Sequence, residues 1–508
     1  MRTLERPARE ERAVRIALLW PRGFDPSTTL PLPLGYLKSN LDSERYDVRI
    51  LDCAVRGWGA DSSQVRRWLA DFAPDMVGVS TWSPMFPEAL SLLATVRELV
   101  PNAVTVLGGA HPSSYAERSL EHSEVDYVVA GEAEFAFPRL VDELQKGEPS
   151  LASVPGLVWR QDDGTLGQND KERPELDAIV LPDYEAIGLD VYNRHGYRWN
   201  SPPVPNAPLW LTRGCPYRCQ YCAAPDLNGR LIRRHSVEYA LSWIRGLYDK
   251  RGIRWFNIID DNFTYDVRWA KEFCRALIEL NLPGVGFGTP NGIRMKRGDP
   301  ELWSLMKQAG WEHVIVAPES GSTDTLERMK KDLKVGEVPR IVREIQDAGL
   351  RCQAFFIVGY PGETEKDLQE SFALIRECKF NFVFLANFQP LPGTPVYDDL
   401  VAAGEIEDGL IPYNFSDAMR VYSPEGLEGF NFSKFMLKTY LMMAVSNPAN
   451  VPYQLSILHR LYKPQFVGKK LLRVVWSAVR PGGKQPVPRF VPMHQQAAAV
   501  HGSPSTGS

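Results

Sequence analysis

The sequence predicts an α/β protein with two regions of alternating strand-like and helix-like segments, followed by a mostly helical region. Residues 14–148 alternate strand-like and amphipathic stretches, and residues 207–400 do so again. Strands separated by helical crossovers form parallel sheets. We therefore expect a doubly wound, Rossmann-like domain at 14–148, a partial (β/α)6 barrel at 207–400 and a helical C-terminal region at 401–482.

The first region contains five expected strands, and a doubly wound sheet binds ligands beyond the carboxyl ends of its strands. Amphipathic helices are expected between them, for example at Ser63–Phe72 and Pro87–Val100. Gly108, Gly109 and Gly131 lie in or just after two of the strands. The expected strands are Val14–Trp20, Tyr46–Asp52, Met76–Thr81, Thr105–Leu107 and Tyr127–Ala130.

The second region contains six expected β/α units. A complete eight-unit barrel would normally need about 250 residues, so six units suit a partial barrel with its chemistry at the carboxyl ends of the strands. Helices are expected at Val237–Lys250, Val267–Leu280 and Val335–Ala348. The expected strands are Pro208–Thr212, Trp255–Asp260, Gly284–Gly288, Val314–Ala317, Gln353–Val358 and Phe382–Phe388.

The remaining segments have weaker patterns. Residues 149–206 are interpreted as a linker with a short hairpin at Gly156–Leu166. In the C-terminal region, Lys469–Arg480 alternates basic and apolar residues and could touch a membrane surface or a lipid-like substrate, although we favour an ordinary packed helix. The composition of residues 483–508 predicts a disordered tail. We assign the shaping of the substrate site to residues 401–482.

Composition excludes several classes of protein. The chain has 508 residues, 44% hydrophobic and 24% charged, as in an ordinary soluble globular protein. Its net charge of −4 gives no reason to expect nucleic acid as a partner. The first residues lack a secretory signal, and no apolar run reaches the roughly 20 residues of a membrane span. We expect a cytoplasmic protein whose scattered cysteines are buried free thiols, namely Cys53, Cys274, Cys352 and Cys378.

The other three cysteines form a C-x3-C-x2-C run made of Cys215, Cys219 and Cys222, directly after an expected strand. Three thiolates this close can ligate three corners of a [4Fe–4S] cubane and leave one iron open, which marks a reactive site. The alternative is a structural zinc site completed by His235. Zinc motifs usually pair two C-x2–4-C halves, or a C-x2-C with two histidines, and neither pattern is present.

At these residues the sequence resembles the radical SAM superfamily. The resemblance implies that the three cysteines hold the cluster and that its open iron binds S-adenosylmethionine (SAM). An electron from an external one-electron reductant, such as flavodoxin or ferredoxin, would then cleave SAM to give a 5′-deoxyadenosyl radical. Tyr221 resembles the aromatic residue that the family packs near the adenine.

Residues after three further strands match the family in the same order. Asp260, Asp261 and Asn262 lie where the family carries a Gly-Gly-Glu-like motif for the methionine amino group. The residues differ from that motif, but carboxylate and amide oxygens can accept from an ammonium.

The fourth and fifth strands end in two further matches. Glu319, in the run Pro-Glu-Ser-Gly, resembles the residue that reaches the cofactor ribose, and a carboxylate can accept from both ribose hydroxyls. Gly359 and Gly362 belong to a Gly-Tyr-Pro-Gly-Glu-Thr stretch that is common in the cobalamin-linked and methylthiolating branches. The resemblance implies that these glycines admit the adenine.

The first region alone could be a flavodoxin-like regulator, a nucleotide binder or a cobalamin binder. No G-x-G-x-x-G or Walker run follows its first strand, which disfavours dinucleotides and ATP. Its place upstream of the barrel and its Leu-Pro-Leu-Gly, Gly-Gly-Ala-His-Pro and Gly-Glu-Ala-Glu runs resemble the cobalamin-binding domain of B12-dependent radical SAM enzymes. The resemblance implies that cobalamin is lined by Trp82, Gly108, Gly109, His111, Gly131 and Glu132.

One departure from other cobalamin proteins concerns the cobalt ligand. The Asp-x-His-x-x-Gly loop is absent, because no histidine lies between residues 1 and 110. We therefore expect no protein histidine on cobalt and expect His111 to cap or pack. Trp82 could cover the lower cobalt face or be ordinary packing.

The leading hypothesis is a cobalamin-dependent radical SAM enzyme that methylates an unactivated carbon of a small, secondary-metabolite or lipid-like molecule. A second hypothesis keeps both cofactors but replaces methyl transfer with cyclisation, ring contraction or oxidation. A third is a non-catalytic cobalamin or cluster sensor, which is disfavoured because a sensor needs no open iron.

Overall fold

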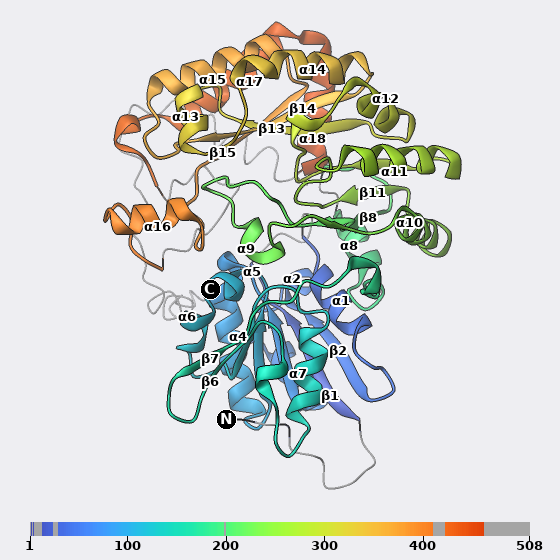
Figure 1. Ribbon diagram of the computed structural model, residues 1–508, viewed down its shortest axis with the longest axis vertical. Coiled ribbons are helices and arrows are strands. Elements are labelled where there is room, and N and C mark those ends of the chain that lie inside the picture. Colours follow the sequence, from blue (N-terminus) through green and yellow to red (C-terminus); the bar gives the residue numbers. More distant parts are fainter. Residues whose placement is uncertain are drawn as a thin grey trace, which may run out of the picture.

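The computed structural model describes Arg2, Leu4 and residues 13–23, 29–197, 200–409 and 422–461. Figure 1 shows two lobes, the lower made by the first third of the chain and the upper by the rest. The segment Lys469–Arg480 and the tail at 483–508, for which surface contact and disorder were considered, lie outside the described residues.

The lower lobe is built on a seven-stranded sheet in the order β2-β1-β3-β4-β5-β6-β7. Its first five strands are parallel, as the sequence predicts, and β6 and β7 are antiparallel. The strands are β1 Val14–Trp20, β2 Tyr46–Asp52, β3 Met76–Ser80, β4 Val104–Gly108, β5 Tyr127–Val129, β6 Leu157–Arg160 and β7 Leu166–Gln168.

The hairpin β6–β7 belongs to this sheet and is not a free linker. Val128 of β5 pairs with Val158 of β6, so the lower lobe continues at least to residue 168. Gly156 makes the approach possible, because a Cβ there would lie 2.3 Å from the carbonyl oxygen of Ala130. The sheet is therefore mixed, whereas the sequence predicted only its parallel part.

Helices cover both faces of the sheet, which confirms the doubly wound architecture. Successive strand residues point to opposite faces, and Leu18 and Leu19 of β1 accordingly enter two different buried clusters. The helices are α1 Leu32–Ser39, α2 Cys53–Arg56, α3 Ser63–Phe72, α4 Phe86–Leu99, α5 Ala110–Ser114, α6 Ala116–Leu120 and α7 Ala136–Leu144.

The segment between the lobes packs against both of them. It contains α8, Leu189–His195, whose Tyr192 hydroxyl donates to Asp52 at the end of β2 over 2.6 Å. Tyr184 of the same segment donates to the carbonyl oxygen of Pro208 in the upper lobe over 2.5 Å. These residues therefore fix the two lobes to each other.

The upper lobe is the predicted partial barrel. Two parallel three-stranded sheets, β12-β11-β8 and β13-β14-β15, follow each other around the barrel and are joined by single bridges such as Ile293–Val316. A separate short pair, β9 with β10, is antiparallel. The strands are β8 Asn206–Leu209, β9 Thr212–Arg213, β10 Arg233–Arg234, β11 Trp255–Ile258, β12 Gly286–Gly288, β13 His313–Glu319, β14 Arg351–Val358 and β15 Phe382–Asn387.

The first barrel strand differs from the prediction, which ran from Pro208 to Thr212. The chain leaves the barrel sheet after Leu209, and Thr212–Arg213 pairs with Arg233–Arg234 instead. Arg213 therefore points toward the lower lobe, where its guanidinium donates to the carboxylate of Glu132 over 2.9 Å.

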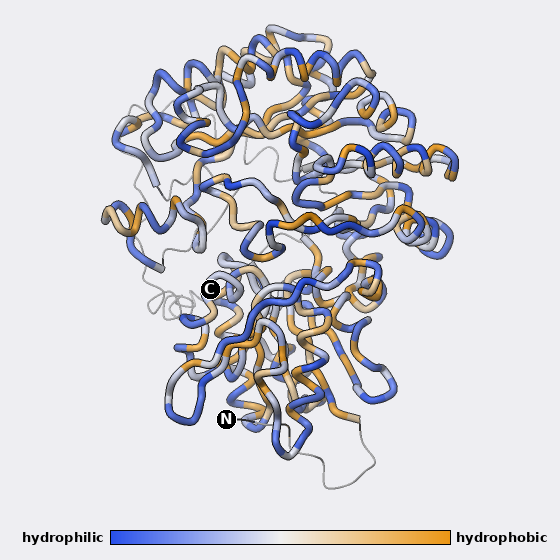
Figure 2. Tube along the Cα trace, in the orientation of Figure 1, coloured by the Kyte–Doolittle hydropathy of each residue, from blue (hydrophilic) through white to orange (hydrophobic). Residues whose placement is uncertain are grey.

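Helices cover the outside of the barrel (Figure 1), and the strands carry the apolar residues while the outer helix faces are hydrophilic (Figure 2). Cys53, Cys274, Cys352 and Cys378 are buried free thiols, as expected. In the described ranges no helix is long and apolar enough to cross a membrane. The helices are α9 Ala224–Asn228, α10 Val237–Arg251, α11 Val267–Leu280, α12 Pro300–Gln308, α13 Thr323–Arg328, α14 Val338–Asp347, α15 Glu365–Cys378, α16 Pro395–Ala402, α17 Phe432–Ser446 and α18 Val451–Leu461.

Candidate cofactor site

The three cysteines lie in one loop, residues 214–223, which we call the cluster loop. It leaves β9 at Gly214, whose φ is +96° and where a Cβ would lie 2.3 Å from the carbonyl oxygen of Leu231. Only glycine allows this conformation and approach. Cys215 then donates its backbone N–H to Gly229 over 2.9 Å, and the three half-buried cysteines form no disulfide.

The thiols have nitrogen donors as neighbours. Asn262 Nδ2 lies 3.8 Å from Cys215 Sγ, and Arg294 Nη1 lies 4.0 Å from Cys219 Sγ. Hydrogen bonds and positive charge near sulfur are among the features that tune iron–sulfur clusters. Burial raises the pKa of the Cys222 thiol to about 12, so that binding to iron would have to drive its deprotonation.

The same loop does not assemble the ligands of a single metal ion. In the described part of the chain, no three His, Cys, Asp or Glu side chains are grouped so that they could hold one ion. A cubane makes a different demand, because each thiolate binds its own iron. His235, the fourth ligand in the zinc alternative, instead contacts Asp177 through Nδ1 at 2.8 Å and stacks on Tyr239.

The residues after β11 bond to the segments that flank the cluster loop. Asp260 Oδ1 accepts from the backbone N–H of Leu211 over 2.7 Å, and Asp261 Oδ2 accepts from Asn228 over 2.7 Å. Burial raises the pKa of Asp260 to about 7. Asp260 Oδ2 and Asn262 Oδ1 are buried without a hydrogen-bond partner among the described residues. Asp260, Asp261 and Asn262 were expected to accept from the SAM ammonium. The unpaired oxygens of Asp260 and Asn262 remain available to such a ligand.

Glu319 stands at a strained position at the end of β13. Its φ is +69°, and the register between β13 and β14 shifts at this point. Left-handed backbone at a non-glycine residue tends to occur at functional sites. Tyr221 donates to Glu319 Oε1 over 3.0 Å, so the structure brings together two residues that the sequence predicted for SAM.

Lys331 completes this group and was missed by sequence reasoning. Its Nζ lies 2.8 Å from Glu319 Oε1 and 3.0 Å from the Tyr221 hydroxyl, and the residue is buried. No motif marks it in the sequence, where it stands among other lysines of an apparent surface turn. A buried lysine beside a carboxylate offers a charge to the carboxylate of a zwitterionic ligand.

The glycine loop after β14 is shaped by Glu363. Its Oε2 accepts from the backbone N–H groups of Gly359 over 2.6 Å and Tyr360 over 3.3 Å, and burial raises its pKa to about 8. Gly359 and Gly362 both have positive φ. A Cβ on Gly359 would meet Pro424 at 3.9 Å, the nearest described atom, so the backbone is not crowded at this position.

The carboxyl edge of the lower sheet is uncharged at its centre. Gly109, after β4, has a φ of +97°, and a Cβ there would lie 2.5 Å from the carbonyl oxygen of Thr81. Three buried polar atoms lack partners among the described residues at this edge: Trp20 Nε1, Ser80 Oγ and His111 Nε2. Unsatisfied buried polar atoms call for a ligand or water. A cobalamin, with its many amide groups, fits such a donor and acceptor set.

His111 and Trp82 lie beside this edge. His111 Nδ1 is 3.0 Å from Ser83 Oγ, and its ring packs on Phe86 at 4.0 Å between centroids. Burial, with a smaller effect of His122, lowers the pKa of His111 to about 3. The side chain is thus a neutral, packed histidine. Trp82 meets Trp20 edge to face at 6.3 Å.

Glu132 and Gly131, which follow β5, are placed differently from each other. Gly131 donates its N–H to Ser113 Oγ over 2.8 Å within the lower lobe. The Glu132 carboxylate, expected to line cobalamin, is instead bound to Arg213 and Arg233 of the upper lobe at 2.9 and 3.0 Å. Sequence reasoning could not find these partners because neither arginine belongs to a recognised motif.

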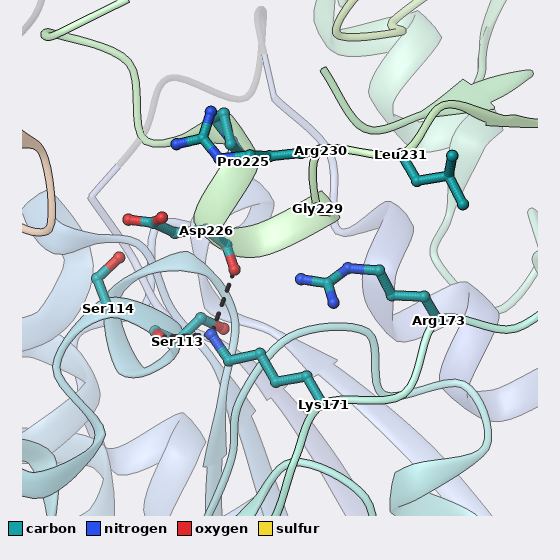
Figure 3. Close-up of a pocket in the computed structure, with 9 residues that line it drawn as sticks. All are labelled: Ser113, Ser114, Lys171, Arg173, Pro225, Asp226, Gly229, Arg230 and Leu231. Carbon is teal, nitrogen blue, oxygen red and sulfur yellow. Dashed lines mark hydrogen bonds between the residues drawn. The ribbon is translucent and has the colours of Figure 1, made fainter. Parts of the chain in front are cut away.

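A polar cavity of about 670 Å³ lies where the lobes meet, beside α5 and α9. In Figure 3, Lys171 reaches from the lower lobe and donates to the carbonyl oxygen of Asp226, and Arg173 points into the same space. Positive side chains outnumber negative ones here. The lining residues are Ser113, Ser114, Lys171, Arg173, Pro225, Asp226, Gly229, Arg230 and Leu231.

Two family models match the chain in the order that the fold suggests. Residues 26–141 match the B12 binding domain, and residues 211–375 match the radical SAM superfamily. A cytidylyl-2-hydroxyethylphosphonate methyltransferase of Streptomyces wedmorensis is 28% identical over 79% of this chain and 83% of its own. An anaerobic magnesium-protoporphyrin IX monomethyl ester cyclase of Rubrivivax gelatinosus is 27% identical over 76% of this chain and 68% of its own.

Solved structures share the fold over both lobes. The cobalamin-dependent SAM radical enzyme OxsB with aqua-cobalamin bound superposes with a TM-score of 0.70 at 19% identity, over 92% of this chain and 72% of its own. The radical SAM methyltransferase TsrM of Kitasatospora setae gives 0.64 at 19% identity, over 77% of this chain and 78% of its own.

Proposed function

We propose that this chain, which belongs to the cobalamin-dependent radical SAM enzymes, transfers a methyl group to an unactivated carbon of a small molecule. Its cofactors are a [4Fe–4S] cluster, SAM and cobalamin. The proposed substrate is of the secondary-metabolite or lipid-like kind. Electrons would come from an external carrier such as flavodoxin or ferredoxin.

The observation that carries the proposal is that the sites expected for the two cofactors adjoin. The cluster loop begins at Gly214, the residue after Arg213. Arg213 contacts Glu132 in the loop that follows β5, the last parallel strand of the lower sheet. Helix α5, which follows Gly109, packs against α9, which follows the cluster loop. Both cofactors would therefore face one space at the lobe boundary, as a reaction that uses both requires.

When bound, the cluster with SAM supplies a 5′-deoxyadenosyl radical, and cobalamin supplies the methyl group. The residues have separate tasks in this proposal. Cys215, Cys219 and Cys222 hold the cluster, while Asn262 and Glu319 bind the amino group and ribose of SAM. Asp260 would offer its unpaired Oδ2 to the same amino group, while its Oδ1 holds the backbone of Leu211 just before the cluster loop. Asp261 would have a supporting role, because it accepts from the backbone N–H of Gly214 in the loop.

Further residues would shape the two cofactor surfaces. Tyr221, Gly359 and Gly362 would border the adenine, since no described atom crowds Gly359 and Tyr221 contacts Glu319. Gly108, Gly109 and Gly131 would let backbone approach cobalamin. His111 and Trp82 would pack beside the cofactor, and His111 would not ligate cobalt because Ser83 and Phe86 hold its ring in place.

A second candidate is cyclisation or oxidation with the same cofactors but without methyl transfer. This candidate is supported by the cyclase of Rubrivivax gelatinosus, which is 27% identical to this chain, nearly as similar as the methyltransferase at 28%. The sensor hypothesis is disfavoured, since the buried oxygens of Asp260 and Asn262 next to the cysteines suit a bound SAM, which a sensor does not need.

Anaerobic turnover with candidate substrates, followed by mass spectrometry, tests the methyl transfer. A methyltransferase should use two SAM molecules per turnover, because methylating cobalt and making the radical are separate reactions. S-adenosylhomocysteine and 5′-deoxyadenosine should therefore appear in about equal amounts, with a product heavier by one methylene unit. If a converted substrate gives 5′-deoxyadenosine without S-adenosylhomocysteine, the second candidate replaces the first.

A further inference from the structure

Four charged side chains meet across the boundary between the lobes. Glu132 and Glu134 lie in the loop after β5 of the lower lobe, and Arg213 and Arg233 lie on the paired strands β9 and β10 of the upper lobe. We call these four residues the interlobe clamp. Glu132 Oε2 accepts from Arg213 over 2.9 Å and from Arg233 over 3.0 Å, and its Oε1 accepts a second bond from Arg233. Glu134 Oε1 lies 2.7 Å from Arg213 Nη2 as an ion pair.

The clamp is closed to water. The exposed fraction of the side chain is 1% for Arg213, 3% for Glu132 and 6% for Arg233. Two cations face two carboxylates, so the group is electrically balanced, as buried charges must be. Although burial alone would lower it, the pKa of Arg213 is raised above its usual value by the carboxylates of Glu134 and Glu132.

The surroundings hold Arg213 in one orientation. Its guanidinium lies over the rings of Trp210, at 4.2 Å, and Tyr36, at 5.3 Å, which come from the upper and the lower lobe. Arg233 also donates to the carbonyl oxygen of Pro174 in the segment between the lobes over 2.8 Å. Guanidinium groups bind carboxylates in a fixed planar geometry, so such contacts specify orientation as well as contact.

The cluster loop starts within this arrangement. Cys215 is two residues beyond Arg213, and Gly214 between them is bonded by its N–H to Asp261. On the other side of the clamp, Gly131 precedes Glu132. Gly131 donates its N–H to Ser113 of α5, the helix that follows Gly109 at the expected cobalamin edge. The clamp thus links the two cofactor sites through very few bonds.

We propose that Glu132 and Glu134 are positioning residues, which hold the cluster loop against the cobalamin domain and so set the distance from the cluster to cobalt. This inference rests on the proposed function for the presence of both cofactors. Glu132 is then not a ligand-binding residue of the cobalamin site. Its carboxylate acts through Arg213 and Arg233. Its loss leaves the buried Arg233 without an ion-pair partner among the described residues, and leaves Arg213 with Glu134 alone.

Pulsed electron paramagnetic resonance of the anaerobic holoenzyme can measure that distance, since the reduced cluster and cob(II)alamin each carry an unpaired spin. Glu132→Gln keeps the side-chain shape and removes the charge. Removing one partner of a buried pair should shift the equilibrium from docked to separated lobes by roughly 100-fold or more. We expect a broader and displaced cluster–cobalt distance distribution, with iron, sulfide and cobalamin contents unchanged.

Matched variants separate positioning from folding. Glu143→Gln removes another buried carboxylate whose partners, Lys146 and Ser150, lie in the lower lobe, and it should keep the wild-type distribution. Glu132→Gln combined with Arg233→Gln restores the charge balance and should narrow the distribution again. If Glu132→Gln does not fold, Glu134→Gln tests the same inference through Arg213 alone.

The outcomes distinguish this inference from the proposed function. A wild-type holoenzyme without a cob(II)alamin signal overturns the proposed function, and the inference with it. A wild-type cluster–cobalt signal that neither Glu132→Gln nor Glu134→Gln alters overturns the clamp alone. Loss of cobalamin from Glu132→Gln, with an unchanged distance in the residual holoenzyme, would show that Glu132 binds the cofactor directly.

Discussion

The two strand edges that face the lobe boundary differ in their chemistry. At the edge of the lower sheet, the central groups are neutral: Gly109, the hydroxyl of Ser80, and His111, whose pKa burial lowers to about 3. At the barrel edge the groups are charged or ionisable, and most are already paired, as Glu319 is with Lys331.

This difference matches the two kinds of ligand. Cobalamin is a large molecule with many amides, and it needs space and neutral hydrogen-bonding groups. The cluster with a zwitterionic cofactor needs thiolates and fixed charges, which cost free energy to bury unless they are paired. The lower edge therefore offers neutral groups to its ligand. The barrel edge instead combines thiols with carboxylates that are bonded to N–H groups or to Lys331.

The largest expected effect is at the barrel edge. Replacing Cys215, Cys219 and Cys222 together by alanine should abolish the cluster and all 5′-deoxyadenosine formation, because no thiolates remain to bind iron. Iron and sulfide analysis after anaerobic reconstitution checks this, with about four of each expected for the unaltered protein. A triple variant that keeps a full cluster would show that these cysteines do not hold it at the barrel edge.

Glu319→Ala should have the next largest effect. A lost charge-assisted hydrogen bond is worth on the order of 1.5–3 kcal/mol, so SAM binding should weaken roughly tenfold to a hundredfold. Glu319→Gln retains an acceptor oxygen and should lose less. Equilibrium binding of SAM measures both. The exposed Glu301, paired with Lys271, provides the control Glu301→Ala, which should bind SAM normally.

A smaller effect concerns stability at the lower edge. His111 has a pKa of about 3 when folded, below the value of about 6.5 of an unfolded histidine, so the unfolded chain binds more protons. Its contribution to stability is complete above pH 6.5 and falls as the pH falls toward 3. Between pH 7 and 5 this loss is about 2 kcal/mol.

The variant His111→Gln should remove that share of the pH dependence. Buried His313, whose pKa burial lowers to about 4, contributes a similar loss and stays in the variant. Urea unfolding at pH 7 and pH 5 compares the two proteins. The exposed His195 provides the variant His195→Gln as a control for the replacement of a histidine in itself. An equal loss in wild type and His111→Gln would contradict a neutral buried histidine.

The smallest expected effect is on cobalt itself. The cob(II)alamin form should show no nitrogen superhyperfine splitting from protein, and His111→Ala should leave its electron paramagnetic resonance spectrum unchanged. The reason is that the Asp-x-His-x-x-Gly loop is absent and that the His111 ring packs on Phe86 and contacts Ser83 through Nδ1. A nitrogen superhyperfine splitting that disappears in His111→Ala would show that His111 binds cobalt. The lower edge would then supply a metal ligand, as the barrel edge does.

Local patterns made much of the molecule predictable. β1, β2 and α3 have the bounds that the sequence predicts, because their alternating or periodic apolar residues are complete within each element. The grouping of the three cysteines was also predictable, since the C-x3-C-x2-C spacing alone places them in one loop. Tyr221 and Glu319 were each predicted to contact SAM, and the structure adds that they contact each other.

The sequence by itself thus determined the two lobes, the cluster loop and the strand ends that border it. Only the tertiary structure decided the partners of charged side chains distant along the chain. Lys331 reaches Tyr221 from 110 residues away, and Glu132 meets Arg213 from 81 residues away. The hairpin β6–β7 likewise joined the first sheet through pairing with β5. Such choices depend on which buried charges and strand edges lie nearest after folding, and no local pattern encodes that proximity.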